Sequence, residues 1–245
     1  MNLNNKHINI YKQNGVIVLK KIFKKRDIQN LKREINKYIK NYRNKLKGKE
    51  INFIKKKINS IHKFKVSFFK KFSNQKKIMK LGDFFLNSKS KVKHYEYFAK
   101  PKKIGLESPM HQDNYYWNLI DPNALTMWIA IDKADKKNGS LDYLIGSHKK
   151  LFKHEASNAP GSSQKVSNIN KLRKKYKLKS FKLQPGDCLI HHAQVVHGSK
   201  KNKSNYDRRG FTVQLVPIGA KVDNKKFNAY QKSLENQIQQ RSKLQ

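Results

Sequence analysis

The chain is poor in cysteine, in long hydrophobic runs and in acidic residues, and each shortage excludes a class of protein. Only one of its 245 residues is a cysteine, Cys188, so an internal disulfide cannot form. No window approaches the run of about 20 apolar residues that spans a bilayer, and the first fifteen residues lack the apolar stretch of a secretory signal. We therefore expect a cytoplasmic protein with no membrane partner, in which Cys188 is a small buried core residue.

The shortage of acidic residues leaves a large positive charge. The chain has 16 Asp and Glu against 56 Lys and Arg, a formal net charge of +40. Such an excess ordinarily suggests nucleic acid or an anionic membrane surface as a partner. Only seven of the basic residues are Arg, however, and the 49 Lys are scattered over every segment. Because recognition of phosphates and base edges favours the Arg fork, and because an A+T-rich genome favours Lys, Asn and Ile codons, we expect no specific nucleic-acid partner.

Length and aromatic content favour one folded domain. The hydrophobic fraction of 37% is low, but 13 Phe and 11 Tyr are spread along the chain, as they are not in a disordered protein. A chain of this length can form one substantial core. We expect a single domain over residues 1–245, with a helix-rich part to about residue 90, a strand-rich core at about 91–220 and a polar tail at about 221–245.

The N-terminal part shows mainly helical spacing of its apolar residues. A turn at Asn14-Gly15 precedes a predicted strand at 16–19, and the apolar positions from Ile28 to Tyr42 then predict an amphipathic helix. Two further helical regions are predicted at 64–72 and 78–85. The aromatic residues of these helices are interpreted as core residues.

From Val92 onward the pattern changes to short strands and turns. Predicted strands lie at 125–131, 140–145, 188–191, 195–198 and 209–216. The first two are expected to form a hairpin through residues 136–139, because Asn138-Gly139 is a strong hairpin signal. Pro185-Gly186-Asp187 is a predicted turn.

Two segments show no clear period. The polar stretch at 157–177 is a candidate loop or lid over a site formed by the sheets. The tail at 224–245 is predicted to be either a peripheral helix or mobile.

Two residues in one short strand provide the first sign of chemistry. Because residues i and i+2 of a strand point to the same face, His111 and Asp113 are expected side by side, with Gln112 on the other face. Two histidines and one carboxylate on one side of an iron leave the opposite coordination positions open, as Fe(II) oxygenases require. A second histidine must then come from elsewhere in the chain.

The candidates for this second histidine lie in the C-terminal half: His148, His154, His191, His192 and His197. His197 is the best, because it begins a His-Gly-Ser motif and Arg208 follows eleven residues on. The co-substrate 2-oxoglutarate would chelate iron through its keto acid end, and its distal carboxylate would need a cation in the pocket. Arg208 on the next strand can supply that cation as a bidentate partner.

In this order of elements the chain resembles the phytanoyl-CoA dioxygenase family. The resemblance covers nearly the whole chain and is carried by PMHQDNYY at 109–116, TMWIAI at 126–131, NGSL at 138–141, GSHK at 146–149 and the segment from HGS at 197–199 to Arg208 and Arg209. It implies a mainly β fold with flanking helices, namely a double-stranded β-helix (a jelly-roll, cupin-like barrel) with iron bound inside one end.

The resemblance also implies an activity: a non-haem Fe(II)- and 2-oxoglutarate-dependent dioxygenase that hydroxylates a small-molecule substrate, uses O2, and releases succinate and CO2. The residues that match the family's catalytic iron ligands are His111, Asp113 and His197. Arg208 matches its anchor for the co-substrate.

Other positions take weaker or structural roles by the same resemblance. Trp128 would line the 2-oxoglutarate site, and Tyr95 is a further candidate for it. His148 is a structural signature rather than a ligand. Of the adjacent His191 and His192, only one can face the barrel interior if both lie on a strand.

Strand alternation separates the two neighbouring arginines. If Arg208 faces the interior with residues 210, 212 and 214, then Arg209 shares the opposite face with the apolar residues 211, 213 and 215. Arg209 would then cover apolar surface or meet solvent.

Three alternative functions remain. A nucleic-acid dealkylase would suit the charge, but the relatives in question carry an Arg-x-Asn-x-x-x-Arg tail, whereas this chain has RRGFTVQ at 208–214. A halogenase requires a small residue where Asp113 stands. The third is a non-catalytic jelly-roll binding protein that retains the fold without turnover.

Overall fold

The structure is a computed structural model that describes residues 3–47, 50–157, 159 and 163–242. The larger of its two main sheets contains β1 (Val16–Leu19), β2 (Ile51–Ile54), β3 (Lys57–Ile61), β4 (Ser90–Lys100), β6 (Leu125–Ala130), β11 (Cys188–His192) and β13 (Arg208–Pro217). The smaller contains β5 (Ser108–His111), β7 (Leu141–Leu144), β10 (Leu178–Ser180) and β12 (His197–Ser199). A separate pair is formed by β8 (His154–Ala156) and β9 (Gln164–Val166).

The two main sheets are antiparallel and pack face to face. Their strand orders are β1-β11-β6-β13-β4-β3-β2 and β10-β7-β12-β5. Trp128 and Leu189 of the larger sheet share a buried cluster with Tyr143 of the smaller one. The expected mainly β jelly-roll with flanking helices is confirmed, although no described pairing closes the sheets into a continuous barrel.

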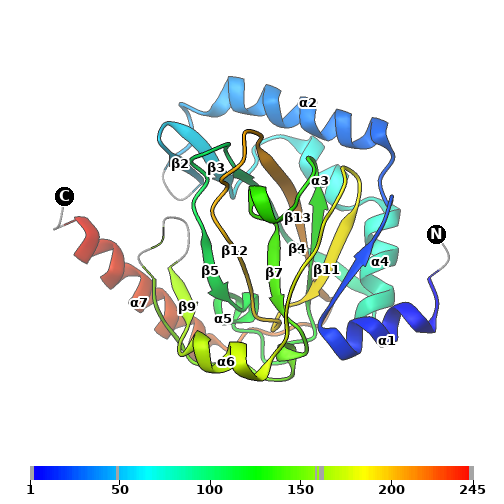
Figure 1. Ribbon diagram of the computed structural model, residues 1–245, viewed down its shortest axis with the longest axis vertical. Helices are drawn as coiled ribbons and strands as arrows, with labels where there is room; N and C mark the ends of the chain where they lie inside the picture. Colours follow the sequence, from blue (N-terminus) through cyan, green and yellow to red (C-terminus); the bar gives the residue numbers. More distant parts are fainter. Residues whose placement is uncertain (1–2, 48–49, 158, 160–162, 243–245) are drawn as a thin grey trace.

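Helices cover the outer face of the larger sheet (Figure 1). They are α1 (Asn5–Asn14), α2 (Lys25–Tyr42), α3 (Ser67–Ser73) and α4 (Lys76–Leu86). The apolar spacing of α2 favours this packing, because Leu31 and Ile35 lie on one face of the helix and are buried in the core cluster that also contains Phe211 and Val213 of β13. Full burial of one such side chain stabilises the fold by roughly 1.5–3 kcal/mol. The predicted helices at 28–42, 64–72 and 78–85 are confirmed apart from their ends.

Asn138-Gly139 does not form the expected hairpin. Residues 136–138 form a short 3-10 helix that is capped by the Asp135 side chain, and Gly139 ends it with φ +77. The Asn138 side chain donates to the Lys133 carbonyl at 2.7 Å and accepts from the Asp135 amide at 2.8 Å. The chain therefore passes from β6 in one sheet to β7 in the other. The hairpin prediction was wrong because the Asn138 side chain hydrogen-bonds to backbone groups of a short helix rather than taking part in a two-residue turn.

The segment at 157–177 is more regular than expected. Of its described residues, 164–166 form β9 and Ile169–Lys175 form α6, whereas residues 158 and 160–162 lie outside the described part. Val166, Ile169 and Leu172 pack in a small apolar cluster with Met110 of β5. Reading this part of the segment as an irregular loop was therefore wrong.

The tail forms the peripheral helix that was one of its two expected states. It is α7 (Asn224–Ser242), which lies on the side of the molecule away from α1 in Figure 1. Tyr230 of α7 packs on the rings of Tyr115 and Tyr116 in α5 (Asp113–Trp117). Residues 243–245 lie outside the described part. No described helix is both long and apolar enough to cross a bilayer.

Candidate functional site

His111, Asp113 and His197 come together between the two sheets. His111 ends β5, Asp113 begins α5, and His197 begins β12 opposite His111 in the strand register. The Asp113 Oδ1 atom lies 3.7 Å from His111 Nε2 and 3.6 Å from His197 Nε2. One ligand atom from each residue lies within 4.8 Å of the others. His111 and Asp113 are therefore adjacent, as expected. They do not share one continuous strand, because β5 ends at His111 and α5 begins at Asp113.

The backbone holds both imidazoles with Nε2 toward this common point. His111 Nδ1 lies 2.8 Å from the Pro109 carbonyl oxygen, and His197 Nδ1 lies 3.0 Å from that of Val195. A carbonyl only accepts, so each Nδ1 carries the proton and each Nε2 presents a lone pair. Burial, with a smaller contribution from a neighbouring histidine, lowers the pKa of both imidazoles to about 4. Both are therefore neutral at physiological pH, as metal ligation requires.

Asp113 is held through one oxygen and leaves the other facing the two imidazoles. Its Oδ2 accepts from the Thr126 hydroxyl at 2.6 Å and lies 3.2 Å from His191 Nε2. Burial by itself raises the pKa of this carboxyl, but nearby His197 and the His191 hydrogen bond outweigh it and hold the pKa well below its usual range. The group is therefore an ionised carboxylate with Oδ1 available as a single ligand atom.

His191 faces the cavity, and its neighbour His192 faces away. Burial keeps the Tyr143 hydroxyl protonated by raising its pKa, and this hydroxyl lies 3.0 Å from His191 Nδ1. With the hydroxyl donating to Nδ1, the Nε2 proton of His191 can donate to Asp113. His192 instead packs beside His148 on the outer side of the sheet. The alternation expected for this pair is confirmed, and His191 is the inward member.

The remaining histidines of the C-terminal half lie outside this group. His148 Nε2 contacts the Lys12 carbonyl at 3.1 Å, which fits the structural role expected for it. His154 stacks on Tyr115 at 4.0 Å between ring centroids, and its Nε2 accepts from the Gln112 amide at 3.2 Å. Neither imidazole is directed at the common point.

A cavity of about 480 Å³ opens from the three residues, and Arg208 lies in its wall. Arg208 is 3% exposed, and its guanidinium carbon lies 5.3 Å from the ring centre of Trp128, which also lines the cavity. Gly210 makes this arrangement possible, because a Cβ there would lie 2.1 Å from a Trp128 ring atom. Burial lowers the pKa of Arg208 to about 10, so the group stays charged at neutral pH.

The charge of Arg208 has no carboxylate partner among the described residues. Its Nε atom and the Ser199 hydroxyl are both buried without a hydrogen-bond partner in the described part of the chain. Both residues line the same cavity. An unpaired buried cation is destabilising, so this end of the cavity is suited to an anion.

Arg209 lies on the opposite face of β13, as alternation predicts. Its Nη2 and Nε atoms lie 2.9 Å and 2.5 Å from the two carboxylate oxygens of Asp132. Phe211 and Val213 point to the same side and are buried in the core beneath the helices. Of the two arginines, only Arg208 lines the cavity beside the three candidate ligands.

Tyr95 does not line the cavity. It packs against Phe64 and Phe211 on the helix-covered face of the larger sheet. Its two neighbours on β4, His94 and Glu96, line the cavity, as do Lys93 and Phe98 of the same strand. The prediction that Tyr95 belongs to the co-substrate site was therefore wrong, because Tyr95 lies on the helix-covered face of β4 and not on the face that lines the cavity.

Two polar residues of the site were not identified as functional from the sequence, Thr126 and Ser199, whereas His191 was among the candidate histidines. Ser199 was quoted as part of a motif, and its position two residues after His197 on β12 was a usable signal. Thr126 is recognised only once β6 lies beside β11, where it pairs with His191.

Comparisons with known proteins agree with this geometry. The sequence model of the family described as phytanoyl-CoA dioxygenase (PhyH) matches residues 11–210. A phytanoyl-CoA dioxygenase domain-containing protein 1 homolog of Caenorhabditis briggsae is 28% identical over 155 residues, which are 60% of this chain and 54% of that protein. Phytanoyl-CoA dioxygenase 1 of Oryza sativa subsp. japonica is 27% identical over 151 residues, 60% of this chain and 52% of that protein. The chain thus spans about half the length of these curated relatives.

Solved structures share the fold at low sequence identity. EctD from S. alaskensis, crystallised with 2-oxoglutarate and 5-hydroxyectoine, has a TM-score of 0.78 at 16% identity, with 90% of this chain and 78% of that one covered. AviO1 from Streptomyces viridochromogenes Tue57 has a TM-score of 0.71 at 18% identity, with 88% and 96% covered. At these identities the likeness establishes the fold.

Proposed function

Because the chain belongs to the phytanoyl-CoA dioxygenase family, we propose that it is a non-haem Fe(II)- and 2-oxoglutarate-dependent dioxygenase that hydroxylates a small molecule. One observation carries the proposal. His111 Nε2, His197 Nε2 and Asp113 Oδ1 face one point in a cavity whose wall also contains Arg208, a cation with no carboxylate partner among the described residues. Two imidazoles and one carboxylate are the donor set of Fe(II) oxygenases, and they leave coordination positions open.

The residues present fit both the metal and the co-substrate. The two imidazoles are neutral and oriented, and the carboxylate offers one oxygen, so the three donors already face the position that Fe(II) would take. The buried Arg208 Nε and Ser199 Oγ are the groups that the distal carboxylate of 2-oxoglutarate would satisfy. Fe(II) with 2-oxoglutarate and O2 would supply the oxidation of a substrate C–H bond, with release of succinate and CO2.

Each protein group then has a defined task. Arg208 binds and orients the co-substrate, and Trp128 lies against the guanidinium and keeps it out of water. Thr126 and His191 hold one oxygen of Asp113, which fixes the direction of the other. The buried walls of both sheets exclude water from the reacting centre.

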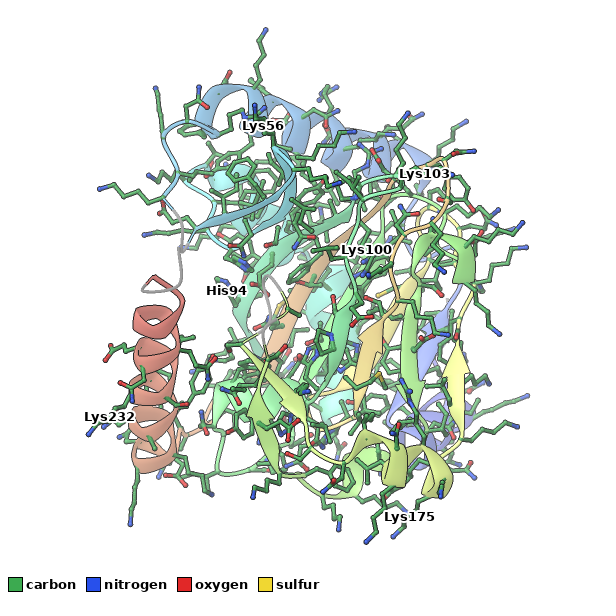
Figure 2. The ribbon with its side chains drawn as sticks, turned by 60° about the vertical axis from the view of Figure 1, so that its left-hand side comes forward. Lys56, His94, Lys100, Lys103, Lys175 and Lys232 are labelled. Carbon is green, nitrogen blue, oxygen red and sulfur yellow. The ribbon has the colours of Figure 1, made fainter. Side chains whose placement is uncertain are left out.

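The lysine distribution supports a small-molecule substrate rather than a nucleic acid. In Figure 2, Lys56, Lys103, Lys175 and Lys232 lie on four separate parts of the molecule and point outward, whereas Lys100 lies inside. Scattered charges of this kind give weak, salt-sensitive attraction without a specific docking surface. A cytoplasmic location remains our prediction, from the single buried Cys188.

Iron loading followed by turnover tests the proposal. The protein is loaded anaerobically with Fe(II), its metal content is measured, and labelled 2-oxoglutarate is added with a panel of metabolites. We expect one Fe(II) per chain and a release of succinate that one group of metabolites stimulates. Failure to bind iron, or iron binding without any conversion of 2-oxoglutarate, would remove the proposal.

A further inference from the structure

The cavity has a second polar wall, which lies away from Arg208. It includes His94 and Glu96 of β4 and Gln214 of β13, and Lys93 lines the cavity beside them. Gln214 is six residues from Arg208 along the strand, roughly 20 Å at about 3.3 Å per residue. Glu96 lies opposite Thr212, four residues and roughly 13 Å along the strand from Arg208, so the wall and the arginine line different parts of the cavity.

The same wall lies close to the candidate metal ligands. Thr126, which holds Asp113, pairs with Gln214 across β6 and β13, and Gln214 pairs with His94 on β4. Two strand spacings of about 4.8 Å separate β6 from β4. A molecule held against β4 would thus lie within roughly 10 Å of the ligand cluster, a distance that a small substrate can span.

Glu96 is the centre of this wall, and it is held in place from two sides. His62 Nδ1 contacts its Oε1 atom, and Gln214 Nε2 donates to its Oε2 atom at 2.8 Å. On the other side of the imidazole, His62 Nε2 lies 2.9 Å from the Asn52 side-chain amide, which can donate to it. His62 therefore carries its proton on Nδ1 and donates it to the carboxyl group.

The carboxyl group of Glu96 keeps unused acceptor capacity. A carboxylate offers about four lone-pair sites, and the described contacts from His62 and Gln214 use two. Apart from Asp113, Glu96 is the only acidic residue among the described residues that line the cavity. Its side chain is 12% exposed, and half-exposed His94 lies 3.9 Å away on the side of the molecule where α7 lies in Figure 2. What approaches Glu96 from the cavity should therefore donate hydrogen bonds.

The apolar part of the lining is mainly aromatic rather than aliphatic. Phe98, Tyr116, Trp117 and Trp128 supply this aromatic surface, and Phe98 lies opposite Gly210 near the arginine end. Leu141 is the one aliphatic hydrophobic residue among the described lining residues, and it pairs with Ser199 at the arginine end. A fatty acyl chain would have to desolvate Glu96 and Gln214 without offering them a partner, which is unfavourable.

We propose that the substrate is a compact polar molecule whose N–H or O–H group donates a hydrogen bond to Glu96, and not a fatty acyl thioester. The inference rests on the proposed dioxygenase function and specifies its substrate class. Amines and neutral polyols share this donor chemistry. They differ in charge, so an amine should depend more strongly on the negative charge of Glu96 than a polyol does.

The experiment compares compound classes on the iron-loaded protein with 2-oxoglutarate. The probes are a panel of small amines and amino alcohols, a panel of neutral polyols, and a panel of fatty acids and fatty acyl-CoA thioesters. Succinate release is measured for the wild type, for Glu96→Gln, and for Glu155→Gln, which replaces an exposed glutamate on β8 as the matched control. Binding of Fe(II) and 2-oxoglutarate is measured on the same samples.

We expect stimulation by one of the two donor panels, with kcat/KM for the responding compound at least about ten-fold lower in Glu96→Gln and unchanged in Glu155→Gln. Stimulation by the amine panel identifies the charged class, and stimulation by the polyol panel identifies the neutral one. The inference is overturned if fatty acyl compounds stimulate most, if neither donor panel stimulates, or if Glu96→Gln matches the wild type on the responding compound. If the wild type itself did not bind Fe(II) or did not bind 2-oxoglutarate, the proposed dioxygenase function would be contradicted instead.

Discussion

Replacing Arg208 should have opposite effects on co-substrate binding and on the stability of the protein without ligand. Arg208→Met removes a buried cation that has no carboxylate partner in the described structure, and it leaves a side chain of similar length. A hydrogen bond to a charged group is worth about 1.5–3 kcal/mol. Because about 1.4 kcal/mol corresponds to ten-fold, the Kd for 2-oxoglutarate should rise about ten- to a hundred-fold or more.

The free energy of unfolding without ligand should not decrease in Arg208→Met, although its affinity for 2-oxoglutarate does. The ligand-free Arg208→Met protein should be at least as stable as the wild type, since a buried charge without a partner is destabilising. In the wild type, 2-oxoglutarate at a hundred times its Kd should add about 2.7 kcal/mol to the free energy of unfolding. At the same ligand concentration a ten- to hundred-fold higher Kd should reduce this increment to about 1.4–0.4 kcal/mol in Arg208→Met.

Arg209→Met is the matched control on the adjacent residue. It breaks the two contacts with Asp132 and should lower the free energy of unfolding by about 1–3 kcal/mol, with little change in 2-oxoglutarate affinity. The assays are calorimetric titration of 2-oxoglutarate under matched iron loading and urea unfolding with and without ligand. A larger loss of affinity in the Arg209 variant would refute the assignment of the inward face.

The other predictions concern the metal ligands, their support, pH and nucleic acid. Alanine at His111, Asp113 or His197 should abolish iron binding and turnover, whereas His192→Phe should retain both; metal analysis after gel filtration decides, and iron retention by His197→Ala would contradict the ligand set. His191→Phe should weaken Fe(II) binding about 10–100-fold, measured by competition with a chelator, and unchanged affinity would show that its contact with Asp113 is incidental. Burial, then nearby His148, lowers the pKa of His192 to about 3. The unfolded chain therefore binds one more proton at this residue below about pH 6.5. As the pH is lowered from there, this residue alone should decrease the free energy of unfolding of the metal-free protein by about 1.4 kcal/mol per pH unit. Urea unfolding of His192→Phe between about pH 6 and 4 should show a slope smaller by that amount, and an equal slope would contradict the burial argument. Binding to nucleic acid should weaken by at least about a hundred-fold from low to physiological salt in a filter-binding assay; submicromolar binding that persists at physiological salt would favour a dealkylase.

The candidate ligands could be predicted from the sequence because their signals are local. His111 and Asp113 are two residues apart, and His197 and Arg208 are placed by motif and spacing on successive strands. The supporting residues could not, because their roles depend on which strands pair. Thr126 meets Asp113 only through the position of β6 in the larger sheet.

Local sequence predicted a hairpin turn that does not form and did not predict one that does, because strand pairing decides where a hairpin forms. The Asn138-Gly139 pair suggested a hairpin, yet the chain changes sheets there. A real two-residue hairpin turn, between β2 and β3, is formed by Lys55 and Lys56 at φ +46 and +62, a conformation that Gly or Asn usually supplies. Backbone strain at Lys55 and Lys56 is tolerated because β3 pairs with β4, and a local sequence pattern contains no information about that pairing.

Both tryptophans of the chain, Trp117 and Trp128, line the cavity that holds the candidate ligands. Trp128 lies beside the Arg208 guanidinium, and Trp117 lies on α5, which begins at Asp113. Tryptophan dominates the ultraviolet emission of a protein excited near its red edge, so the intrinsic fluorescence of this protein arises entirely from the walls of one cavity. Occupation of that cavity by a metal ion, a co-substrate or a substrate can therefore be followed optically on the unlabelled wild-type chain.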